Sequence, residues 1–394
     1  LLSPVFIILT GIMNFLNLAD TNAPFMAELE AAASKVIRSG CYLHGPETLA
    51  FEKELAAQSG AAYAIGVSNG LDALRLILRA YIELGLLKKG DAVMVAANTF
   101  IATVLPVTEF GLVPLFVEPD AETMNFSWSE ALRILEENDK AGSKLNIRCA
   151  MITHLYGTPC WDRQAAEEMR SRGIIIVEDN AQAIGAQAAE EGFNGVRASG
   201  NLADASAISF YPTKNVGALG DAGAVVTNDV ALADTVKALA NYGTDRRYHN
   251  VYAGYNCRLD EIQAAMLRVK LRHLHDEVMR RNQTASVYAE EIGNPVVTLP
   301  KIFPDMVQVW HQYVICVPPE IRDVMREYLD KNGVQTDIHY PVPPYLQPCY
   351  SEDYLPKEAT VATRLAKSCI SLPIANVSQE QAREVARIIN DFNL

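Results

Sequence analysis

The stretch from Ser209 to Asn215, Ser-Phe-Tyr-Pro-Thr-Lys-Asn, is the part of this sequence that most narrows its fold. An apolar run at residues 205–210 leads into it and is typical of a buried strand. Lys214 lies near the end of the stretch, and glycines at positions 217 and 220 follow it. Most lysines lie on protein surfaces. Lys214 therefore becomes a candidate for chemistry only together with residues elsewhere in the chain.

An acidic pair, Glu178 and Asp179, directly follows a second apolar run at residues 174–177. In open α/β sheets, ligands bind beyond the carboxyl ends of the strands. A lysine that forms a Schiff base and a carboxylate that partners a protonated pyridine nitrogen are what pyridoxal 5'-phosphate (PLP) requires. We therefore predict that Lys214 and Asp179 are catalytic residues of a PLP enzyme. Glu178 is the alternative acid, and helix capping is the alternative role of Asp179.

Length and composition are those of an ordinary globular protein. At 394 residues the chain is longer than one hydrophobic core usually supports, which favours two domains or one large domain with an appendage. The net charge of −13 argues against a nucleic-acid partner, since such a protein carries a basic face. The seven cysteines are widely spaced, without a Cys-x-x-Cys pair. This pattern favours reduced thiols in the cytoplasm over disulfides or a metal site.

The first residues differ from the rest of the chain. Residues 1–12 are apolar, lack a basic start and are too few to span a membrane. A stretch that is typical of an enzyme start follows at Met13. We interpret residues 1–12 as an upstream or non-native extension, with a signal peptide as the alternative. No other segment approaches a membrane-spanning length, so no membrane partner is expected.

Strand and helix patterns alternate as far as residue 227, which is typical of a mostly parallel sheet with helices on both faces. The apolar runs predict strands at 64–67, 92–95, 113–117, 150–153, 174–177, 205–210 and 224–227. Helices are predicted at 24–39, 47–58, 71–84, from 101 onward and at 162–172.

The pattern changes after residue 256. Further elements are predicted as one long helix or two abutting helices at 259–290, a strand at 310–317, helices at 321–332 and 361–367, and a terminal helix within 373–394. The prolines at 341–344 predict an exposed loop. We therefore predict a large domain at 13–259 and a smaller C-terminal domain at 260–394.

Small polar residues join the predicted strand at 64–67 to the helix that follows it. The backbone N–H groups of Asn69, Gly70 and Leu71 could hold a phosphate there, helped by the helix dipole. Ordinary helix capping explains the same residues equally well. The hydroxyl group of Ser209 is a further candidate for binding phosphate.

Four more positions are candidates for binding. Gln182 could hydrogen-bond the phenolic oxygen of the cofactor, or it could be a surface polar residue. Phe100 could stack on a planar ring, or it could belong to the core. Asn256 and Arg258 lie in a loop at the predicted domain junction, where binding residues concentrate. Capping of the long helix by Asp260 is the alternative explanation of that loop.

In their order along the chain, these motifs resemble the DegT-type nucleotide-sugar aminotransferases. The resemblance runs from about Asn14 to the C-terminus, and the matching segments are Ser68–Gly70, Asn98–Phe100, Val177–Ala183, Ser209–Asn215 and Tyr255–Asp260. It implies an α/β, fold-type-I PLP transferase, similar to aspartate aminotransferase. Such an enzyme has a large domain with a mostly parallel, seven-stranded mixed sheet and a smaller C-terminal α/β domain. It works as a homodimer with active sites at the subunit interface.

The resemblance also implies roles for individual residues. Lys214 forms the Schiff base and moves the proton, and Asp179 keeps the pyridine nitrogen protonated. Gln182 contacts the ring oxygen, and Phe100 lies against the ring. The residues that hold the cofactor, which cycles to pyridoxamine 5'-phosphate, then include Asn69, Gly70, Leu71, Ser209 and, from the partner subunit, Asn256.

Two segments, Asn69–Leu74 and His154–Gly157, resemble the branch of the family that aminates C3 of dTDP-3-oxo-6-deoxyhexoses. The resemblance implies L-glutamate as the amino donor. The sequence departs from the usual family pattern at Asn180, Ile184 and Tyr345. Contacts with the substrate are expected from His154, Tyr156, Arg258, His339, Tyr340 and Tyr345.

Three other functions remain open at this point. The chain could aminate C4 of a nucleotide-linked sugar, or it could aminate a cyclitol. It could also be a non-catalytic regulator that retains the PLP fold. A related dehydratase branch carries histidine in place of the Schiff-base lysine, so the presence of Lys214 favours transamination.

Overall fold

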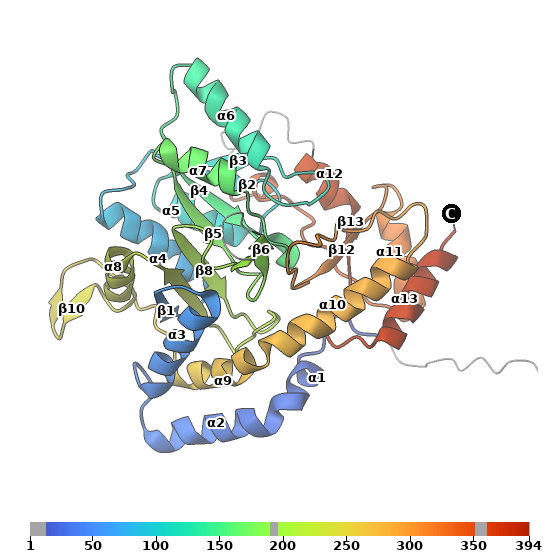
Figure 1. Ribbon diagram of the computed structural model, residues 1–394, viewed down its shortest axis with the longest axis horizontal. Helices are drawn as coiled ribbons and strands as arrows, with labels where there is room; N and C mark the ends of the chain where they lie inside the picture. Colours follow the sequence, from blue (N-terminus) through green and yellow to red (C-terminus); the bar gives the residue numbers. More distant parts are fainter. Residues whose placement is uncertain (1–12, 190–195, 351–360, 394) are drawn as a thin grey trace, which may run out of the picture.

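The computed structural model describes residues 13–189, 196–350 and 361–393. Its centre is a seven-stranded sheet in the order β1-β9-β8-β5-β4-β2-β3 (Figure 1). The strands are β1 (Tyr63–Val67), β2 (Ala92–Ala96), β3 (Val113–Val117), β4 (Ile147–Thr153), β5 (Ile175–Asp179), β8 (Ala205–Ser209) and β9 (Gly223–Thr227). All seven predicted strands are therefore present in one sheet.

The sheet is mixed but mostly parallel. Strands β3, β2, β4, β5 and β8 pair in parallel, whereas β9 is antiparallel to both β8 and β1. The predicted fold class is confirmed. Because β5 and β8 are parallel neighbours, Asp179 and Ser209 emerge at the same edge of the sheet.

Helices cover both faces of this sheet. One face packs against α4 (Gly70–Glu83), α5 (Leu105–Glu109) and α8 (Val230–Ala240), and the other packs against α6 (Trp128–Lys140) and α7 (Arg163–Ser171). Along β2, Val93 and Val95 belong to the first core, whereas Met94 belongs to the second. This alternation is what a strand that is buried on both faces requires.

The N-terminal helices form a further layer. They are α1 (Leu18–Asn22), α2 (Met26–Ser39) and α3 (Pro46–Ser59). Helix α9 (Glu261–Arg272) packs against α2 and α3, and its Leu267 and Leu271 share a core with Phe51 and Phe210. Glu261 joins the layers, because its carboxylate accepts the backbone N–H groups of Gly45 at 2.9 Å and Thr48 at 2.7 Å.

The C-terminal part has its own α/β core. The two-stranded antiparallel sheet of β12 (Tyr313–Cys316) and β13 (Cys369–Leu372) packs with α10 (Leu274–Glu291), α11 (Arg322–Lys331) and α13 (Gln379–Asp391). Helix α12 (Val361–Ser368) precedes β13. The predicted long helix is two abutting helices that meet at His273. The domain boundary between residues 259 and 260 stays a prediction.

Three sequence predictions differ from the structure in detail. The strand predicted at 310–317 begins only at Tyr313, because Trp310 adopts a φ of 44° and its carbonyl accepts from Arg281. The helix predicted from Ile101 is a 3-10 turn, Ile101–Thr103, followed by the short α5. In the proline run, Pro344 is buried rather than exposed.

Several elements were not predicted at all. Helices α6 and α8 were missed, although Ser127 and Asp229 cap their first turns. The short antiparallel pairs β6 (Gln187–Ala189) with β7 (Val196–Ala198), and β10 (Thr244–Arg246) with β11 (His249–Asn250), were also missed. Within the three described ranges, no helix combines the length and apolar composition needed to cross a membrane.

Candidate active site

Lys214 lies in the loop between β8 and β9. Its backbone N–H donates to the carbonyl of Tyr211 at 2.8 Å, which closes a tight turn with Pro212 and Thr213 at its centre. Burial lowers the pKa of its amine to about 8, and the nearby negative charge of Asp179 acts against that shift. A substantial fraction of the amine is therefore neutral, and so nucleophilic, near physiological pH.

Asp179 is the last residue of β5 and is buried. Its Oδ2 accepts the hydroxyl hydrogen of Thr103 at 2.7 Å, and its Oδ1 accepts the backbone N–H of Ala181 at 3.2 Å. Burial raises the pKa of the Asp179 carboxyl, while these hydrogen bonds and the charge of Lys214 oppose the rise. Thr103 was not predicted, since a threonine in a short turn carries no signal in the sequence.

Glu178 has a different environment from its neighbour, because successive side chains of a strand point to opposite faces. Its fully buried carboxylate accepts the backbone N–H groups of Gly200 at 2.7 Å and Leu202 at 2.8 Å. It also accepts from Nε2 of His154 at 2.8 Å. Glu178 therefore holds together three segments of the chain, and Asp179 is the acid that interacts with Lys214.

His154 has no free ring nitrogen. Its Nδ1 accepts the backbone N–H of Cys160 at 2.9 Å, so its proton lies on Nε2 and is donated to Glu178. The side chain is fully buried. Its proposed contact with the substrate thus has no support in this geometry, which instead gives His154 a role in orienting Glu178.

The loop between β1 and α4 adjoins Ser209. Asn69 caps α4, since its Oδ1 accepts the backbone N–H of Asp72 at 2.8 Å. A Cβ atom on Gly70 would lie 2.5 Å from Cβ of Ser209, so only glycine permits this close approach. The start of α4, with Gly70 and Leu71, and the Ser209 hydroxyl thus line one small region. A helix start beside a hydroxyl group is suited to a phosphate.

Gln182 hydrogen-bonds to two other predicted residues, Tyr156 and Tyr340. Its Oε1 accepts the backbone N–H of Tyr156 at 2.6 Å, and its Nε2 donates to the hydroxyl of Tyr340 at 2.9 Å. The hydroxyl of Tyr156 donates to the carbonyl of His339 at 2.5 Å. Phe100 is half exposed, and its ring centroid lies 5.1 Å from that of Tyr340. These residues form one wall next to Asp179.

Three of the predicted site residues lie away from Lys214 in the fold of one chain. Arg258 donates to Oδ1 of Asn241 at 3.1 Å and lines a separate cavity of about 1000 Å³. Asn256 is exposed and pairs with Asn241 through a β-bridge. The buried hydroxyl of Tyr345 shares a hydrogen bond of 2.8 Å with Thr363. Within one chain, the structure does not bring these side chains to Lys214.

The residues around Lys214 fit PLP. The close approach of Gly70 to Ser209 leaves a glycine-lined cradle at a helix start for the phosphate. The buried carboxylate of Asp179 has the chemistry needed to hold a proton on a pyridine nitrogen. In the described part of the chain, no three His, Cys, Asp or Glu side chains gather as metal ligands would.

Comparisons with known proteins identify the family of this chain. Residues 25–390 match the model of the DegT/DnrJ/EryC1/StrS aminotransferase family. The chain is 41% identical to dTDP-3-amino-3,6-dideoxy-alpha-D-galactopyranose transaminase from Aneurinibacillus thermoaerophilus, and the match covers 96% of this chain and 99% of that protein. It is 42% identical to the Erythromycin biosynthesis sensory transduction protein EryC1 from Saccharopolyspora erythraea, over 94% of this chain and 97% of that protein.

A solved structure gives the same result. The chain superposes on S. venezuelae DesV in complex with a ketimine intermediate with a TM-score of 0.88 and 38% sequence identity. That superposition covers 97% of this chain and 98% of DesV. The family model extends over most of the chain, and the enzymes of this family use PLP. This chain therefore belongs to the DegT/DnrJ/EryC1/StrS aminotransferase family of PLP-dependent enzymes.

Proposed function

We propose that this enzyme transfers the amino group of L-glutamate to C3 of a dTDP-linked 3-oxo-6-deoxyhexose. The observation that carries the proposal is the interaction of the buried Lys214 amine with Asp179. The substrate class is supported by the transaminase from Aneurinibacillus, whose name describes a dTDP-3-amino-3,6-dideoxy sugar. The product would serve the biosynthesis of a deoxyamino sugar for a surface polysaccharide or natural product.

When bound, PLP withdraws electrons from the substrate carbon that carries the nitrogen. Lys214 would hold the cofactor through its amine and would move a proton at that carbon, because its pKa of about 8 lets the amine both accept and release one. Asp179 would hold the proton of the pyridine nitrogen, and Thr103 orients its carboxylate. Gln182 and Phe100 would contact the ring, and Asn69, Gly70, Leu71 and Ser209 would hold the phosphate.

The sugar is expected to contact the wall that contains His339 and Tyr340. Tyr156 supports this wall through its hydrogen bond to the carbonyl of His339. Arg258 and Asn256 can act on a cofactor and substrate only if a second subunit supplies them, since they line or border the separate large cavity of their own chain. We assign Tyr345 a supporting role behind the site, because its hydroxyl is bonded to Thr363.

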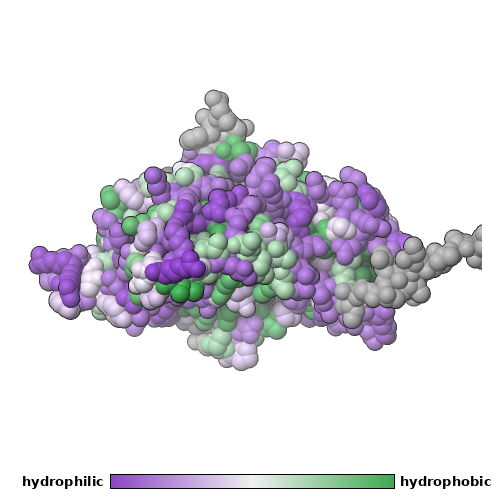
Figure 2. Space-filling model, turned by 90° about the horizontal axis from the view of Figure 1, so that it is seen from below, coloured by the Kyte–Doolittle hydropathy of each residue, from purple (hydrophilic) through white to green (hydrophobic). Residues whose placement is uncertain are grey.

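A homodimer is part of this proposal. Figure 2 shows hydrophobic side chains among hydrophilic ones on the face viewed from below Figure 1, where α2 lies. Ile37, Tyr42 and Leu49 near α2 and α3 are 60%, 58% and 61% exposed. An obligate interface commonly covers exposed apolar groups of this kind. Seven unpaired cysteines support a reducing, cytoplasmic location.

The test is an assay of the purified enzyme with PLP, L-glutamate and dTDP-linked 3-oxo and 4-oxo sugars. We expect an amino group at C3 of the 3-oxo sugar only, identified by mass spectrometry and NMR. An amino product from the 4-oxo sugar alone would replace the proposal with C4 amination. Product from a cyclitol ketone and neither sugar would assign the enzyme to that substrate class.

A regulatory function is the second candidate, because EryC1 is named a sensory transduction protein. The presence of Lys214, Asp179 and Gln182 in one site argues for catalysis, since a regulator has no need of a proton-transferring amine. A purified protein that remains colourless with excess PLP and converts no ketone would favour the regulatory function.

A further inference from the structure

A cavity of about 370 Å³ adjoins the loop that carries Lys214. Thr213, the neighbour of Lys214, lines it together with His311 and His339. Burial lowers the pKa of both histidines, and the positive charge of Lys214 lowers it further, so both lie within electrostatic reach of the amine. The cavity is therefore next to the position where the nitrogen is transferred.

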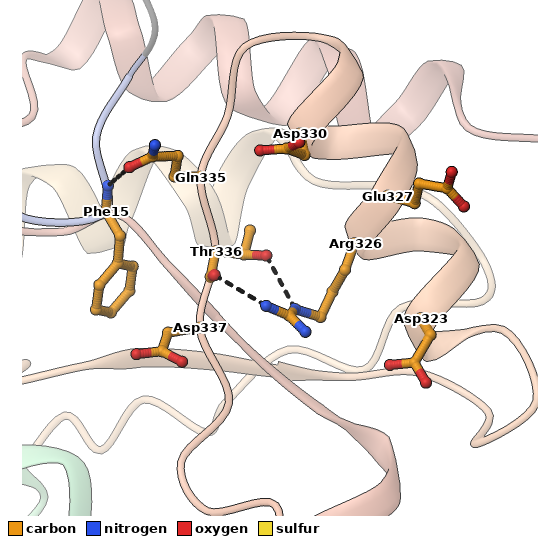
Figure 3. A pocket seen from close by; sticks show the side chains of 8 residues that line it. All are labelled: Phe15, Asp323, Arg326, Glu327, Asp330, Gln335, Thr336 and Asp337. Carbon is orange, nitrogen blue, oxygen red and sulfur yellow. Dashed lines mark hydrogen bonds between the residues drawn. The ribbon is translucent and has the colours of Figure 1, made fainter.

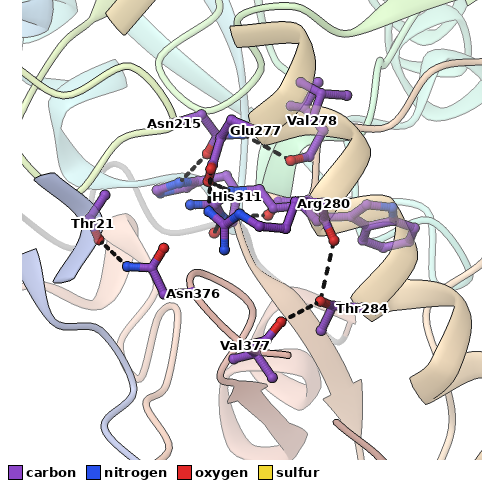
Figure 4. A network of polar contacts seen from close by, with 12 residues as sticks. Thr21, Asn215, Glu277, Val278, Arg280, Thr284, His311, Asn376 and Val377 are labelled. Carbon is purple, nitrogen blue, oxygen red and sulfur yellow. Dashed lines mark hydrogen bonds and ion pairs between the residues drawn. The ribbon is translucent and has the colours of Figure 1, made fainter. Parts of the chain in front are cut away.

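Arg281 of α10 supplies a cationic group to this cavity. Its side chain is only 2% exposed, and its Nε donates to Glu277 at 2.6 Å. Its Nη1 donates to the carbonyls of Trp310 at 2.9 Å and His311 at 3.3 Å. Figure 4 shows Glu277, Arg280 and His311 in the surrounding network of polar contacts. Its Nη2 has no hydrogen-bond partner among the described residues, and Arg281 lines the cavity. One NH₂ group of this buried guanidinium is therefore available to a ligand.

The charge of this cluster is not balanced. Glu277 pairs with both Arg280 and Arg281, so one carboxylate faces two guanidinium groups. The two arginines hold the pKa of the buried Glu277 carboxyl below its usual range, so it stays ionised. Glu277 therefore offsets only one of the two guanidinium charges. Asp337 also lines the cavity, but its side chain is 56% exposed, so an anion would still be attracted to the buried guanidinium of Arg281.

His311 supplies the opposite hydrogen-bonding group. The Nδ2 of Asn215 donates to the carbonyl of Val309 at 2.9 Å, which fixes the Asn215 amide so that its Oδ1 lies 3.2 Å from Nδ1 of His311. An amide oxygen can only accept, so Nδ1 of His311 carries the proton. Burial and the charges of Lys214 and Arg281 lower the pKa of His311 well below its usual range. The imidazole is neutral, and its Nε2 is an acceptor without a partner in the described ranges.

We propose that this cavity is the docking site of the amino donor, with Nη2 of Arg281 binding its carboxylate and Nε2 of His311 accepting from its ammonium group. An α-amino acid zwitterion carries both complementary groups, whereas a nucleotide-linked keto sugar has no ammonium group. This inference rests on the proposed transaminase function and adds to it the residues that select the donor.

A neighbouring hollow is unsuited to the same ligand. Figure 3 shows it beside Phe15, with Asp323, Glu327 and Asp330 around it. Its one guanidinium, that of Arg326, already donates to the hydroxyl of Thr336 at 3.2 Å and to its carbonyl at 3.1 Å. An anion would meet four carboxylates there, since Asp337 also lines this hollow. The cavity beside Lys214 contains a single carboxylate, that of Asp337, which lies 3.7 Å from Nε2 of His339.

The first test compares the two arginines that share Glu277. The probe is glutarate, a dicarboxylate without an amino group, and its dissociation constant is measured on the PLP-loaded enzyme by calorimetry. Arg281→Met should raise that constant about 10-fold to 100-fold, which is the effect of losing a hydrogen bond to a charged group. Arg280→Met removes the other partner of Glu277 but no group that lines the cavity, so glutarate binding should change less than about 2-fold. Equal effects of both substitutions, or none with Arg281→Met, would overturn the proposal.

The second test uses His311→Gln, which stays informative if Arg281→Met fails to fold. L-2-methylglutamate has an ammonium group but no α-hydrogen, so it binds without completing the reaction. We expect its dissociation constant to rise about 10-fold in His311→Gln, while that of glutarate stays within about 2-fold. Weaker binding of both probes would mean that His311 only supports the site, and unchanged binding of both would exclude it as the acceptor.

The two proposals fail in different ways. Conversion of the keto sugar by the pyridoxamine form, measured alone, should keep its rate in the Arg280→Met enzyme, because Arg280 lines no part of the cavity. If wild-type enzyme aminates the sugar but the probes bind equally to all variants, only the donor site is wrong. If wild-type enzyme binds both probes yet aminates neither sugar, the proposed sugar substrate is wrong and the donor site stands.

Discussion

The loop that carries Lys214 and the β10–β11 hairpin differ in how far the polar side chains around them are buried. Around Lys214, the carboxylate of Asp179 and the amide of Gln182 are buried and bonded to groups of the same chain. On the hairpin, Tyr248 is 87% exposed, and the guanidinium of Arg247 lies 4.9 Å from the centroid of its ring. The first region is assembled within one chain, whereas the second presents its groups outward, as the proposed dimer would require.

The largest effect on activity is expected from a substitution in the first of these two regions. Lys214→Ala should lower the turnover number at least about 10³-fold, because it removes both the Schiff-base amine and the proton carrier. The visible absorbance of the Schiff base should disappear as well. Tyr248→Ala should retain that absorbance at saturating PLP. The side chain of Tyr248 is exposed and, within the described residues, makes no hydrogen bond to the loop that carries Lys214. Absorbance and product formation are measured on both variants. A Lys214→Ala enzyme that makes many equivalents of amino sugar would refute the assignment of the lysine.

A second expectation concerns the two adjacent acids of β5. Asp179→Asn should lower turnover about 10²-fold to 10³-fold, because a neutral amide no longer stabilises a proton on the pyridine nitrogen. Glu178→Gln should instead lower the free energy of unfolding by about 3 kcal/mol, since a donor NH₂ replaces an oxygen that accepts buried N–H groups. Urea unfolding and single-turnover kinetics distinguish the two. If Glu178→Gln has the larger effect on turnover at full stability, the roles of the two acids are reversed.

The smallest expected effect is a dependence on pH. In the protein without its cofactor, the rate of Schiff-base formation with PLP should rise as pH increases through about 8, because only the neutral amine of Lys214 reacts. The negative charge of Asp179 raises the pKa of Lys214, so Asp179→Asn should move the midpoint to lower pH. The rate is followed by absorbance between pH 6.5 and about 10. A midpoint near the ordinary lysine value of about 10.4 would show that the amine is not buried.

Prediction from the sequence succeeded where the signal was local. Seven apolar runs marked seven strands, and the turn residues around Gly70 and Lys214 marked the loops at their ends. The sequence could not separate Glu178 from Asp179, because only the direction of each side chain on β5 decides which one interacts with Lys214. Membership in the family could also be recognised from the order of the motifs.

Residues brought in from distant segments were not predictable. Thr103, Arg281 and His311 reach the site through tertiary contacts, and none stands in a distinctive pattern. His154 shows the reverse case, since its place in a matching segment suggested contact with substrate, whereas both of its ring nitrogens are bonded within the protein. The roles of the site residues therefore remain proposals that the variants above can test.

The reversed direction of β9 has a consequence for the speed of the reaction. Since β9 returns antiparallel to β8, the segment with Lys214 is closed at its base, where Ser209 pairs with Gly223 and the N–H of Phe210 donates to Ala222 at 2.9 Å. A segment with joined ends has few conformations left to lose. The segment that carries the amine thus loses its conformational entropy during folding and not again at each turnover. Each substrate molecule therefore meets a nucleophile that is already in place.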